Sequence, residues 1–361
     1  MRKRLKEKLD RIFGSCKGID RIVLVNSSEK DPNFTYLTGF RGGMFEGDIL
    51  MADRKGITLY TGALEYETAR EQGFGGLRII KMEDAETTRA LLLGALKGKR
   101  IGINGSFLPY ASYERLRKRY KPKRIVDVQD AFMKARIVKD AEEIANMKRA
   151  AKITRTALGR ISRDFKAGMT ERKLARRFDD ISDGLGSEGH SFETIVSFGK
   201  NAALPHHMPD GTRLRKGDFV LIDSGAKVNN YCSDMTRTFI FGGADGKGYG
   251  EKKEMLRIVK EAQSRAISSI RPGLTGSEVD KVARSYLDSV DGGKYKGKFI
   301  HSLGHSVGIE VHDGAGFSPG SKLKLKENMV ITAEPGVYVP GFGGARREDD
   351  IVITKKGRKI I

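Results

Sequence analysis

Residues 219–238 read FVLIDSGAKVNNYCSDMTRT, and this stretch predicts two β-strands joined by a tight turn. We centre the turn between Val228 and Asn229. Asp223 then lies directly opposite Asp234, with the two Cβ atoms roughly 4.5–5.5 Å apart. Like charges in that position destabilise a hairpin unless a cation bridges them. The stretch therefore predicts a β-rich domain that brings carboxylates face to face.

A second hairpin repeats this arrangement. Glu334 and Glu348 are symmetric about Gly341, between the apolar runs 329–333 and 351–353. Four carboxylates that face each other in pairs, at equivalent places in two hairpins, indicate a site for divalent metal ions. The alternative interpretation is four solvated carboxylates at exposed strand ends, and the symmetry of the four favours the metal site.

The two hairpins belong to a weak internal duplication. Residues 166–171 (KAGMTE) and 271–276 (RPGLTG) each open a helix with apolar residues on one face. Each opening follows a long helical segment, at 140–163 and at 251–270, and precedes a β-rich region that ends in one of the hairpins. We interpret the two segments as related αβ halves of one domain, with a shared site between them.

The first 130 residues form a separate predicted α/β unit. Short apolar or β-branched runs predict strands at 22–25, 49–52, 57–60 and 101–103, and periodic patterns predict helices at 64–72 and 85–96. Asp140 and Glu143 then form the capping-box signature of a long helix. We expect two domains, 1–130 and 131–361, in a mixed α/β (α+β) fold class.

Composition and charge exclude several classes of protein. The hydrophobic fraction of 39% permits a packed core in a chain of 361 residues, and no apolar run is long enough to span a membrane. The basic N-terminus is not followed by an apolar segment, so we expect no signal peptide. Two cysteines fit a reducing compartment, so we expect a cytoplasmic protein without a membrane partner.

The net charge of +21 raises the question of nucleic-acid binding. The basic excess is spread over both predicted domains, and we interpret its densest cluster, at 115–124, as a solvated helix face. Nucleic acid is therefore not the expected partner.

Four of the six histidines can serve one site: His206, His301, His305 and His312. The spacing of His301 and His305 is that of a zinc-binding helix, but the internal glutamate is missing and a glycine argues against a helix. In a regular strand His305 and His312 would point to opposite faces. Both reach one site only if the chain bends, for which Gly308 and Gly314 are the candidates.

Together these motifs resemble the pita-bread metallopeptidases, and within them the prolidase and aminopeptidase P branch. The resemblance is carried by Asp223 and by residues 234–238, 304–308, 311–313, 334–338 and 346–349, and it covers about 135–361. Residues 33–40 (NFTYLTGF) resemble the creatinase-type N-terminal domain. Methionine aminopeptidases generally lack such a domain, which disfavours them here.

The resemblance implies a pita-bread catalytic domain with a pseudo-two-fold repeat and five metal ligands. Asp223 would bind one ion, Asp234 and Glu348 would bridge two ions, and His305 and Glu334 would bind the second. Mainly oxygen ligands with one imidazole suit Mn²⁺, Co²⁺, Fe²⁺ or Zn²⁺, and we favour manganese. The resemblance also implies a homodimer.

The implied reaction is hydrolysis of the bond before a proline in a peptide, by a water molecule that the two ions activate. Glu334 would also accept a proton. The resemblance assigns His206 and His312 to catalysis, His301 to the substrate pocket, and Tyr338 and Arg346 to the support of the metal centre.

One departure from the family bears on substrate length. In prolidases the motif at 311–313 is often followed by Pro-Arg, and that arginine is assigned to the free carboxylate of a dipeptide. Here residues 314–316 are Gly-Ala-Gly. We therefore expect an Xaa-Pro aminopeptidase, with a prolidase (Xaa-Pro dipeptidase) as the alternative. A non-catalytic basic pita-bread binding module and a creatinase-like enzyme are disfavoured because all five ligands are present.

Overall fold

The computed structural model describes residues 2–243 and 248–361, and the chain divides into two compact units, Met1–Arg136 and Ile137–Ile361. The boundary that we expected at residue 130 falls inside helix α6 (Gln129–Arg136), with which the first unit ends. Each unit has its own hydrophobic clusters.

The N-terminal unit contains a six-stranded mixed sheet in the order β4-β3-β2-β1-β5-β6. Its strands are β1 (Arg21–Val25), β2 (Ile49–Ala52), β3 (Ile57–Thr61), β4 (Leu77–Lys81), β5 (Arg100–Ile103) and β6 (Arg124–Asp127). Its other helices are α1 (Arg2–Ser15), α2 (Pro32–Thr38), α3 (Ala63–Glu71), α4 (Ala85–Leu96) and α5 (Tyr110–Tyr120). The predicted strands and helices of this unit are confirmed, and α1, α2, α5, α6, β4 and β6 are additional.

Helix α1 was not predicted from the sequence because charged residues dominate its composition. Eight of its 14 residues are basic or acidic, yet Leu5, Leu9, Ile12 and Phe13 recur at helical spacing and are almost fully buried. The basic cluster at 115–124 lies on α5 and the start of β6, where Glu114 forms ion pairs with Arg117 and Lys118. No helix of the described residues is both long and apolar enough to cross a membrane.

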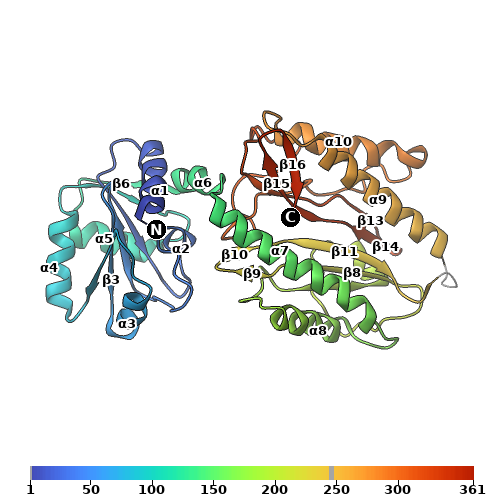
Figure 1. Ribbon diagram of the computed structural model, residues 1–361, viewed down its shortest axis with the longest axis horizontal. Coiled ribbons are helices and arrows are strands. Elements are labelled where there is room, and N and C mark those ends of the chain that lie inside the picture. The colour runs from blue at the N-terminus through green and yellow to red at the C-terminus, as the bar shows by residue number, and fades with distance from the viewer. Residues whose placement is uncertain (1, 244–247) are drawn as a thin grey trace. The chain divides into compact units, whose positions relative to one another are not determined.

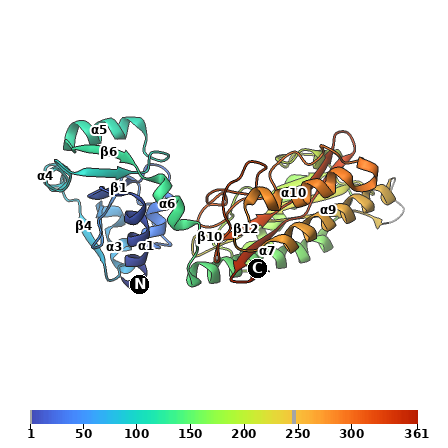
Figure 2. The same ribbon diagram turned by 90° about the horizontal axis from the view of Figure 1, so that it is seen from above.

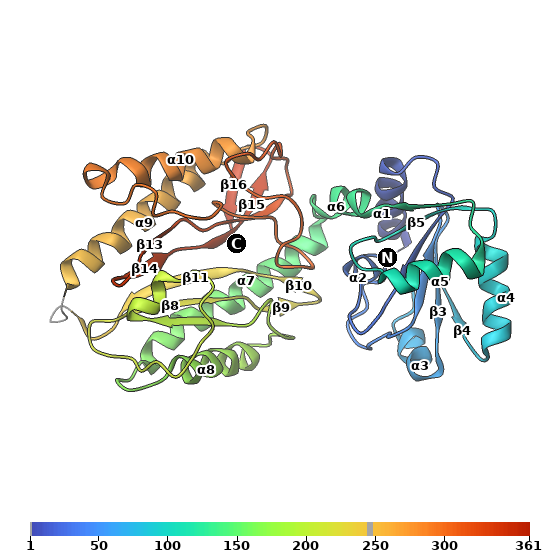
Figure 3. The same cartoon turned by 180° about the vertical axis from the view of Figure 1, so that it is seen from behind.

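The second unit consists of two similar halves (Figures 1, 2 and 3). The first half contains α7 (Ala141–Ile161), η1 (Ser162–Asp164), α8 (Glu171–Gly184), β7 (Ile195–Phe198), η2 (Gly199–Ala203), β8 (Phe219–Ser224), β9 (Lys227–Val228), β10 (Tyr231–Cys232) and β11 (Met235–Ile240). The second half contains α9 (Tyr249–Ser269), α10 (Gly276–Ser289), η4 (Val290–Gly293), β12 (Val330–Ala333), β13 (Gly336–Val339), β14 (Gly343–Arg346), β15 (Asp349–Thr354) and β16 (Gly357–Ile360).

The predicted duplication is confirmed in detail. Helices α7 and α9 both have 21 residues, and α7 begins with the predicted capping box. Thr170 caps α8 and Thr275 caps α10, each by accepting a backbone N–H from three residues further on. Isolated β-bridges also correspond, because Thr170 pairs with Arg213 and Thr275 with Lys324.

The register predicted for the first hairpin is wrong: the turn lies one residue further along the chain, which moves the partner of each strand residue by two positions. Strands β8 and β11 pair so that Asp223 lies opposite Thr236, and Asp234 precedes β11. The turn is made by Asn229 and Asn230, which both have positive φ (50° and 69°). Two consecutive asparagines tolerate this left-handed geometry, which suits a two-residue hairpin turn. Asp234 still shares a face with Asp223, as a diagonal rather than a direct neighbour, because side chains alternate along a strand.

The symmetry predicted for the second hairpin is confirmed. Ala333 pairs with Asp349 in β12 and β15, and Gly336 pairs with Arg346 in β13 and β14. Both pairs are symmetric about residue 341. Glu334 and Glu348 therefore occupy facing positions at the break between these two ladders.

Candidate metal centre and active site

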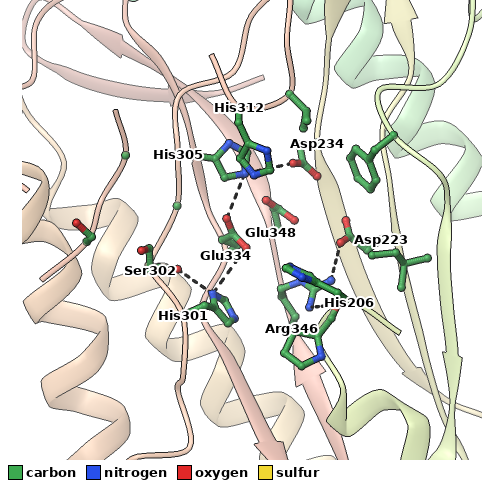
Figure 4. Close-up of a pocket in the computed structure, with 17 residues that line it drawn as sticks. His206, Asp223, Asp234, His301, Ser302, His305, His312, Glu334, Arg346 and Glu348 are labelled. Carbon is green, nitrogen blue, oxygen red and sulfur yellow. Dashed lines mark hydrogen bonds and ion pairs between the residues drawn. The ribbon is translucent and has the colours of Figure 1, made fainter. Parts of the chain in front are cut away.

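A cavity of about 500 Å³ opens inside the second unit, and residues of both halves line it (Figure 4). Nearly every site residue predicted from the sequence is in its wall: His206, Asp223, Asp234, His301, His305, His312, Glu334, Arg346 and Glu348. The remaining one, Tyr338, lies behind the wall, where its hydroxyl group contacts Arg346.

Carboxylates converge on one side of this cavity. The Nε2 atom of His305 lies 3.5 Å from Asp234 Oδ2 and 3.4 Å from Glu334 Oε1. One ligand atom from each of Asp234, His305 and Glu348 lies within 4.8 Å of the others. Asp223 faces this group from β8 (Figure 4). The structure thus brings the five predicted ligands together.

His305 is oriented as a metal-binding histidine would be. Its Nδ1 atom is 3.3 Å from the carbonyl oxygen of Ser306, which identifies Nδ1 as the protonated nitrogen. The lone pair of Nε2 then points at the carboxylates. A hydrogen bond at the second nitrogen is the usual way in which proteins fix such a ligand.

The carboxylates also fit divalent cations because some of their oxygens have no other partner. Within the described part of the chain, Asp223 Oδ1 and Glu348 Oε1 are buried and accept no hydrogen bond. Burial, followed by the repulsion of neighbouring carboxylates, raises the pKa of Asp234 and of Glu348 well above the ordinary values. Buried carboxylates that repel one another in this way favour the binding of cations between them.

Arg346 connects the carboxylates to the surrounding structure. Its guanidinium group is buried and donates to Asp223 Oδ2 at 2.5 Å, to Thr236 Oγ1 at 3.0 Å and to the Tyr338 hydroxyl at 2.9 Å. Thr236 Oγ1 donates in turn to Glu348 Oε2 at 2.7 Å. The predicted supporting role of Arg346 and Tyr338 therefore has a geometric basis, and Thr236 joins them.

His301 is held as a neutral imidazole. Its Nδ1 atom donates to the carbonyl oxygen of Ser302 at 2.8 Å, and its Nε2 atom accepts from the Tyr338 hydroxyl at 2.8 Å. Burial, with a smaller contribution from Arg346, lowers the pKa of His301 to about 4. Both ring nitrogens of His301 thus have hydrogen-bond partners.

The predicted bend between His305 and His312 is confirmed, because the centroids of their rings are only 4.2 Å apart. Gly308 lies within this bend, where a Cβ atom would come to 1.7 Å from Asp313 Oδ2. Burial, followed by the repulsion of His305, lowers the pKa of His312. No helix forms at 301–305, as the glycine in that segment predicts.

Thr236 and Asp350, which lie behind the ligands together with Asp349, were not recognised in this role from the sequence. Asp349 accepts from Arg237 Nη2 at 2.6 Å, and Asp350 Oδ2 accepts from the backbone N–H of Asp234 at 3.0 Å. Burial is the main cause that raises the pKa of Asp350 to about 7. The alternation of side chains along β15 could have indicated Asp350, since it lies two residues after Glu348 and shares its face.

The departure from the prolidase motif falls at residues 314 and 315, which are Gly and Ala in place of Pro and Arg. Ala315 is exposed, so the structure leaves room for a longer side chain at this position, but the sequence supplies none. Among the described residues, the arginine in the cavity wall is Arg346, which is already paired with Asp223.

Comparisons with known proteins agree with this geometry. Residues 145–355 match metallopeptidase family M24, and residues 3–138 match the Creatinase/Prolidase N-terminal domain. The chain is 36% identical over 358 residues to an Xaa-Pro dipeptidase of Pyrococcus horikoshii, covering 98% of this chain and 96% of the relative.

Solved structures extend the comparison. The prolidase from Pyrococcus horikoshii superposes with a TM-score of 0.87 at 34% identity, over 99% of this chain and 97% of that one. An X-Pro aminopeptidase from Thermotoga maritima gives 0.86 at 30% identity, over 96% of each chain. The predicted combination of a creatinase-like N-terminal domain and a pita-bread catalytic domain is confirmed.

Proposed function

The chain belongs to metallopeptidase family M24, and from this premise we propose that it is a metal-dependent Xaa-Pro dipeptidase, that is, a prolidase. The observation that carries the proposal is the group of five convergent ligands, in which buried carboxylate oxygens have no partner within the described residues. The name of the Pyrococcus horikoshii relative supports the dipeptide as the substrate.

The proposed ligands are Asp223, Asp234, His305, Glu334 and Glu348, with two divalent ions held between them. Oxygen ligands with one imidazole suit Mn²⁺, Co²⁺, Fe²⁺ or Zn²⁺, and manganese is the first ion to test. When bound, such ions polarise a peptide carbonyl group and lower the pKa of a water molecule.

The residues of the chain supply the remaining functions. Burial raises the pKa of Glu334, which suits this carboxylate to accept a proton during attack on the peptide bond. His206 and the neutral His312 line the same cavity and are proposed to donate hydrogen bonds to the oxygen on which negative charge develops. Phe192, Ile195 and Val311 give the wall an apolar part that suits a proline ring.

An Xaa-Pro aminopeptidase, the main expectation from the sequence, is the second candidate. The observation in its favour is that Ala315 occupies the position of the arginine that would bind the free carboxylate of a dipeptide. The name of the Thermotoga maritima neighbour is compatible with this candidate. The names of the relatives favour the dipeptidase.

Peptides of different length test the proposal. The purified protein, loaded with Mn²⁺, is assayed on Leu-Pro, Leu-Pro-Ala and Leu-Pro-amide, with Leu-Ala as the control for proline specificity. A dipeptidase has its highest kcat/KM on Leu-Pro. Higher kcat/KM on the tripeptide and the amide would support the aminopeptidase instead. Absence of hydrolysis of all three, in protein that retains its metal ions, would refute both.

We also propose a cytoplasmic homodimer. The support for the compartment is that Cys16 and Cys232 are both free thiols, as expected in a reducing environment. The dimer follows from the resemblance to the prolidase branch. Light scattering on the purified protein tests it, and a mass near 40 kDa at micromolar concentration would contradict it.

A further inference from the structure

A cluster outside the metal centre joins helix α8 to the loop that carries His206. It consists of Glu171, His207 and Asn201, with the backbone of Phe198 and Asp210. We propose that Glu171 and His207 anchor this loop and thereby position His206 in the cavity. The proposal rests on the proposed function only for the role of His206.

Glu171 is a buried carboxylate with an unusually complete set of donors. It is the first residue of α8 and is fully buried. Its Oε1 atom accepts from Phe198 N at 2.7 Å and Asn201 Nδ2 at 3.0 Å. Its Oε2 atom accepts from His207 Nε2 at 2.8 Å and Asp210 N at 3.0 Å. One side chain therefore holds four points between residues 198 and 210.

Backbone hydrogen bonds fix the end of this loop, where Thr170 pairs with Arg213, but no regular secondary structure holds the part around His206. Between η2 and β8 it contains no strand or helix among its described residues. Its residues Pro205 and His206 line the cavity, whereas the side chain of His207 is only 13% exposed and contacts Glu171. Adjacent residues thus face two different environments. A displacement of His207 would be passed directly to His206 through the shared backbone.

The cluster could also be considered as a site for a third metal ion, because ligand atoms of Glu171, His207 and Asp210 lie within 4.8 Å of one another. The hydrogen bonds argue against this interpretation. Both oxygens of Glu171 already accept two N–H groups each. The Asp210 carboxylate accepts from Thr212, which lowers the pKa of Asp210 to about 2. A cation would have to displace these donors.

Comparison of the two halves of the unit shows that the Glu171 carboxylate supplements a backbone hydrogen bond that both halves share. Glu171 N donates to Thr212 O, and in the second half Gly276 N donates to Leu323 O. A Cβ atom at Gly276 would lie 2.8 Å from the carbonyl oxygen of Gly316, so the loop there packs directly on the helix. In the first half, the Glu171 carboxylate bridges a wider gap between helix and loop.

Substitutions of His207 test the anchor. His207→Leu removes the donor, whereas His207→Gln retains an N–H group near the position of Nε2. We expect His207→Leu to lower kcat/KM for Leu-Pro roughly 10–100-fold, as for other residues that position a catalytic group. His207→Gln should restore most of this loss. His190→Leu is the matched control, because His190 is also half-buried beside carboxylates, Asp179 and Asp183, but does not line the cavity.

A double-mutant cycle separates positioning from general damage. If His207 acts through His206, His206→Ala and His206→Ala/His207→Leu have the same kcat/KM within a factor of about two. Multiplied losses in the double variant would overturn the proposal. The metal-to-protein ratio should be the same in His207→Leu as in the unaltered protein, and the loss of an ion would identify the cluster as a metal site instead.

Amide hydrogen exchange gives a measurement that does not depend on activity. Peptides that cover residues 199–212 should exchange at least tenfold faster in His207→Leu than in the unaltered protein or His207→Gln. Equal exchange in all three would refute the anchor, even if the enzyme is active. Conversely, an unaltered protein that hydrolyses no Xaa-Pro peptide would refute the proposed function, while the exchange result would still decide on the anchor.

Discussion

Thr236 offers a sharp test of how the metal ligands are held. Its hydroxyl group is fully buried, donates to Glu348 Oε2 at 2.7 Å and accepts from Arg346 Nε at 3.0 Å. Thr236→Val preserves the shape of the side chain and removes both hydrogen bonds. Thr238→Val is the matched control on the same strand, because the Thr238 hydroxyl bonds only the backbone N–H and carbonyl groups of Arg346.

The structure sets the expected magnitude for metal-free protein. The buried hydrogen bond from Thr236 to Glu348 contributes about 1 kcal/mol. The bond from the charged Arg346 contributes about 2 kcal/mol. Thr236→Val should therefore lower the free energy of unfolding by about 3 kcal/mol, against about 1 kcal/mol for the half-buried Thr238→Val.

Urea unfolding of the metal-free variants measures this difference, and titration with Mn²⁺ adds a second readout. Because Thr236 orients the Glu348 carboxylate, Thr236→Val should weaken metal binding roughly 10–100-fold, whereas Thr238→Val should leave it within about threefold. Equal destabilisation by the two substitutions, or unchanged metal affinity in Thr236→Val, would refute this account of the support of the ligands.

Three further predictions concern charge and protons. The pKa of Asp350 is about 7 in the folded protein against 3.8 ordinarily, so between these pH values the folded state holds a proton that the unfolded state has lost. The free energy of unfolding of the metal-free protein should therefore fall as the pH rises from 4 to 7. Urea unfolding at several pH values measures this dependence, which should be weaker in Asp350→Asn. Lys139 Nζ and Asp313 Oδ2 form a buried ion pair at 3.6 Å. Lys139→Met should lower the free energy of unfolding by about 3–5 kcal/mol, because it leaves the Asp313 carboxylate buried without this partner, and Lys139→Met/Asp313→Leu should recover much of the loss. A double variant as unstable as the single one would contradict this prediction. Because Asp234 and Glu348 have raised pKa values, metal binding near neutral pH should release protons. Calorimetry in buffers of different ionisation enthalpy detects this release. A heat of binding that is the same in all buffers would argue against proton release.

Local patterns in the sequence were sufficient for much of the fold. The capping box at Asp140 and Glu143 specified the start of α7, and the repeated helix openings revealed the two halves. The facing positions of Glu334 and Glu348 followed from symmetry alone because no residue interrupts the register on either side of Gly341.

The first hairpin shows where such reasoning fails. Its register depends on which pair of residues makes the turn, and the choice between Val228–Asn229 and Asn229–Asn230 shifts the partner of every strand residue. The candidate site was still found because Asp223 and Asp234 share a face in either register. In the same way, the five ligands could be named from the motifs, and the bend that joins His305 and His312 could be expected from glycines.

Contacts between distant segments were not accessible in this way. Thr236 joins Glu348 and Arg346 across two different sheets. His207 was not among the histidines expected at the site, and its contact with Glu171 depends on how the loop folds back on α8. Neither leaves a periodic signal, because each contact joins residues that only tertiary packing brings together.

The division of the ligands between the two halves has a consequence for the synthesis of the protein. Asp223 and Asp234 leave the ribosome well before His305, Glu334 and Glu348. A nascent chain that has completed only its first half exposes two aspartates that cannot hold a pair of ions by themselves. Because Glu348 is the last of the five ligands to be synthesised, the complete set can form only after residue 348 has emerged from the ribosome.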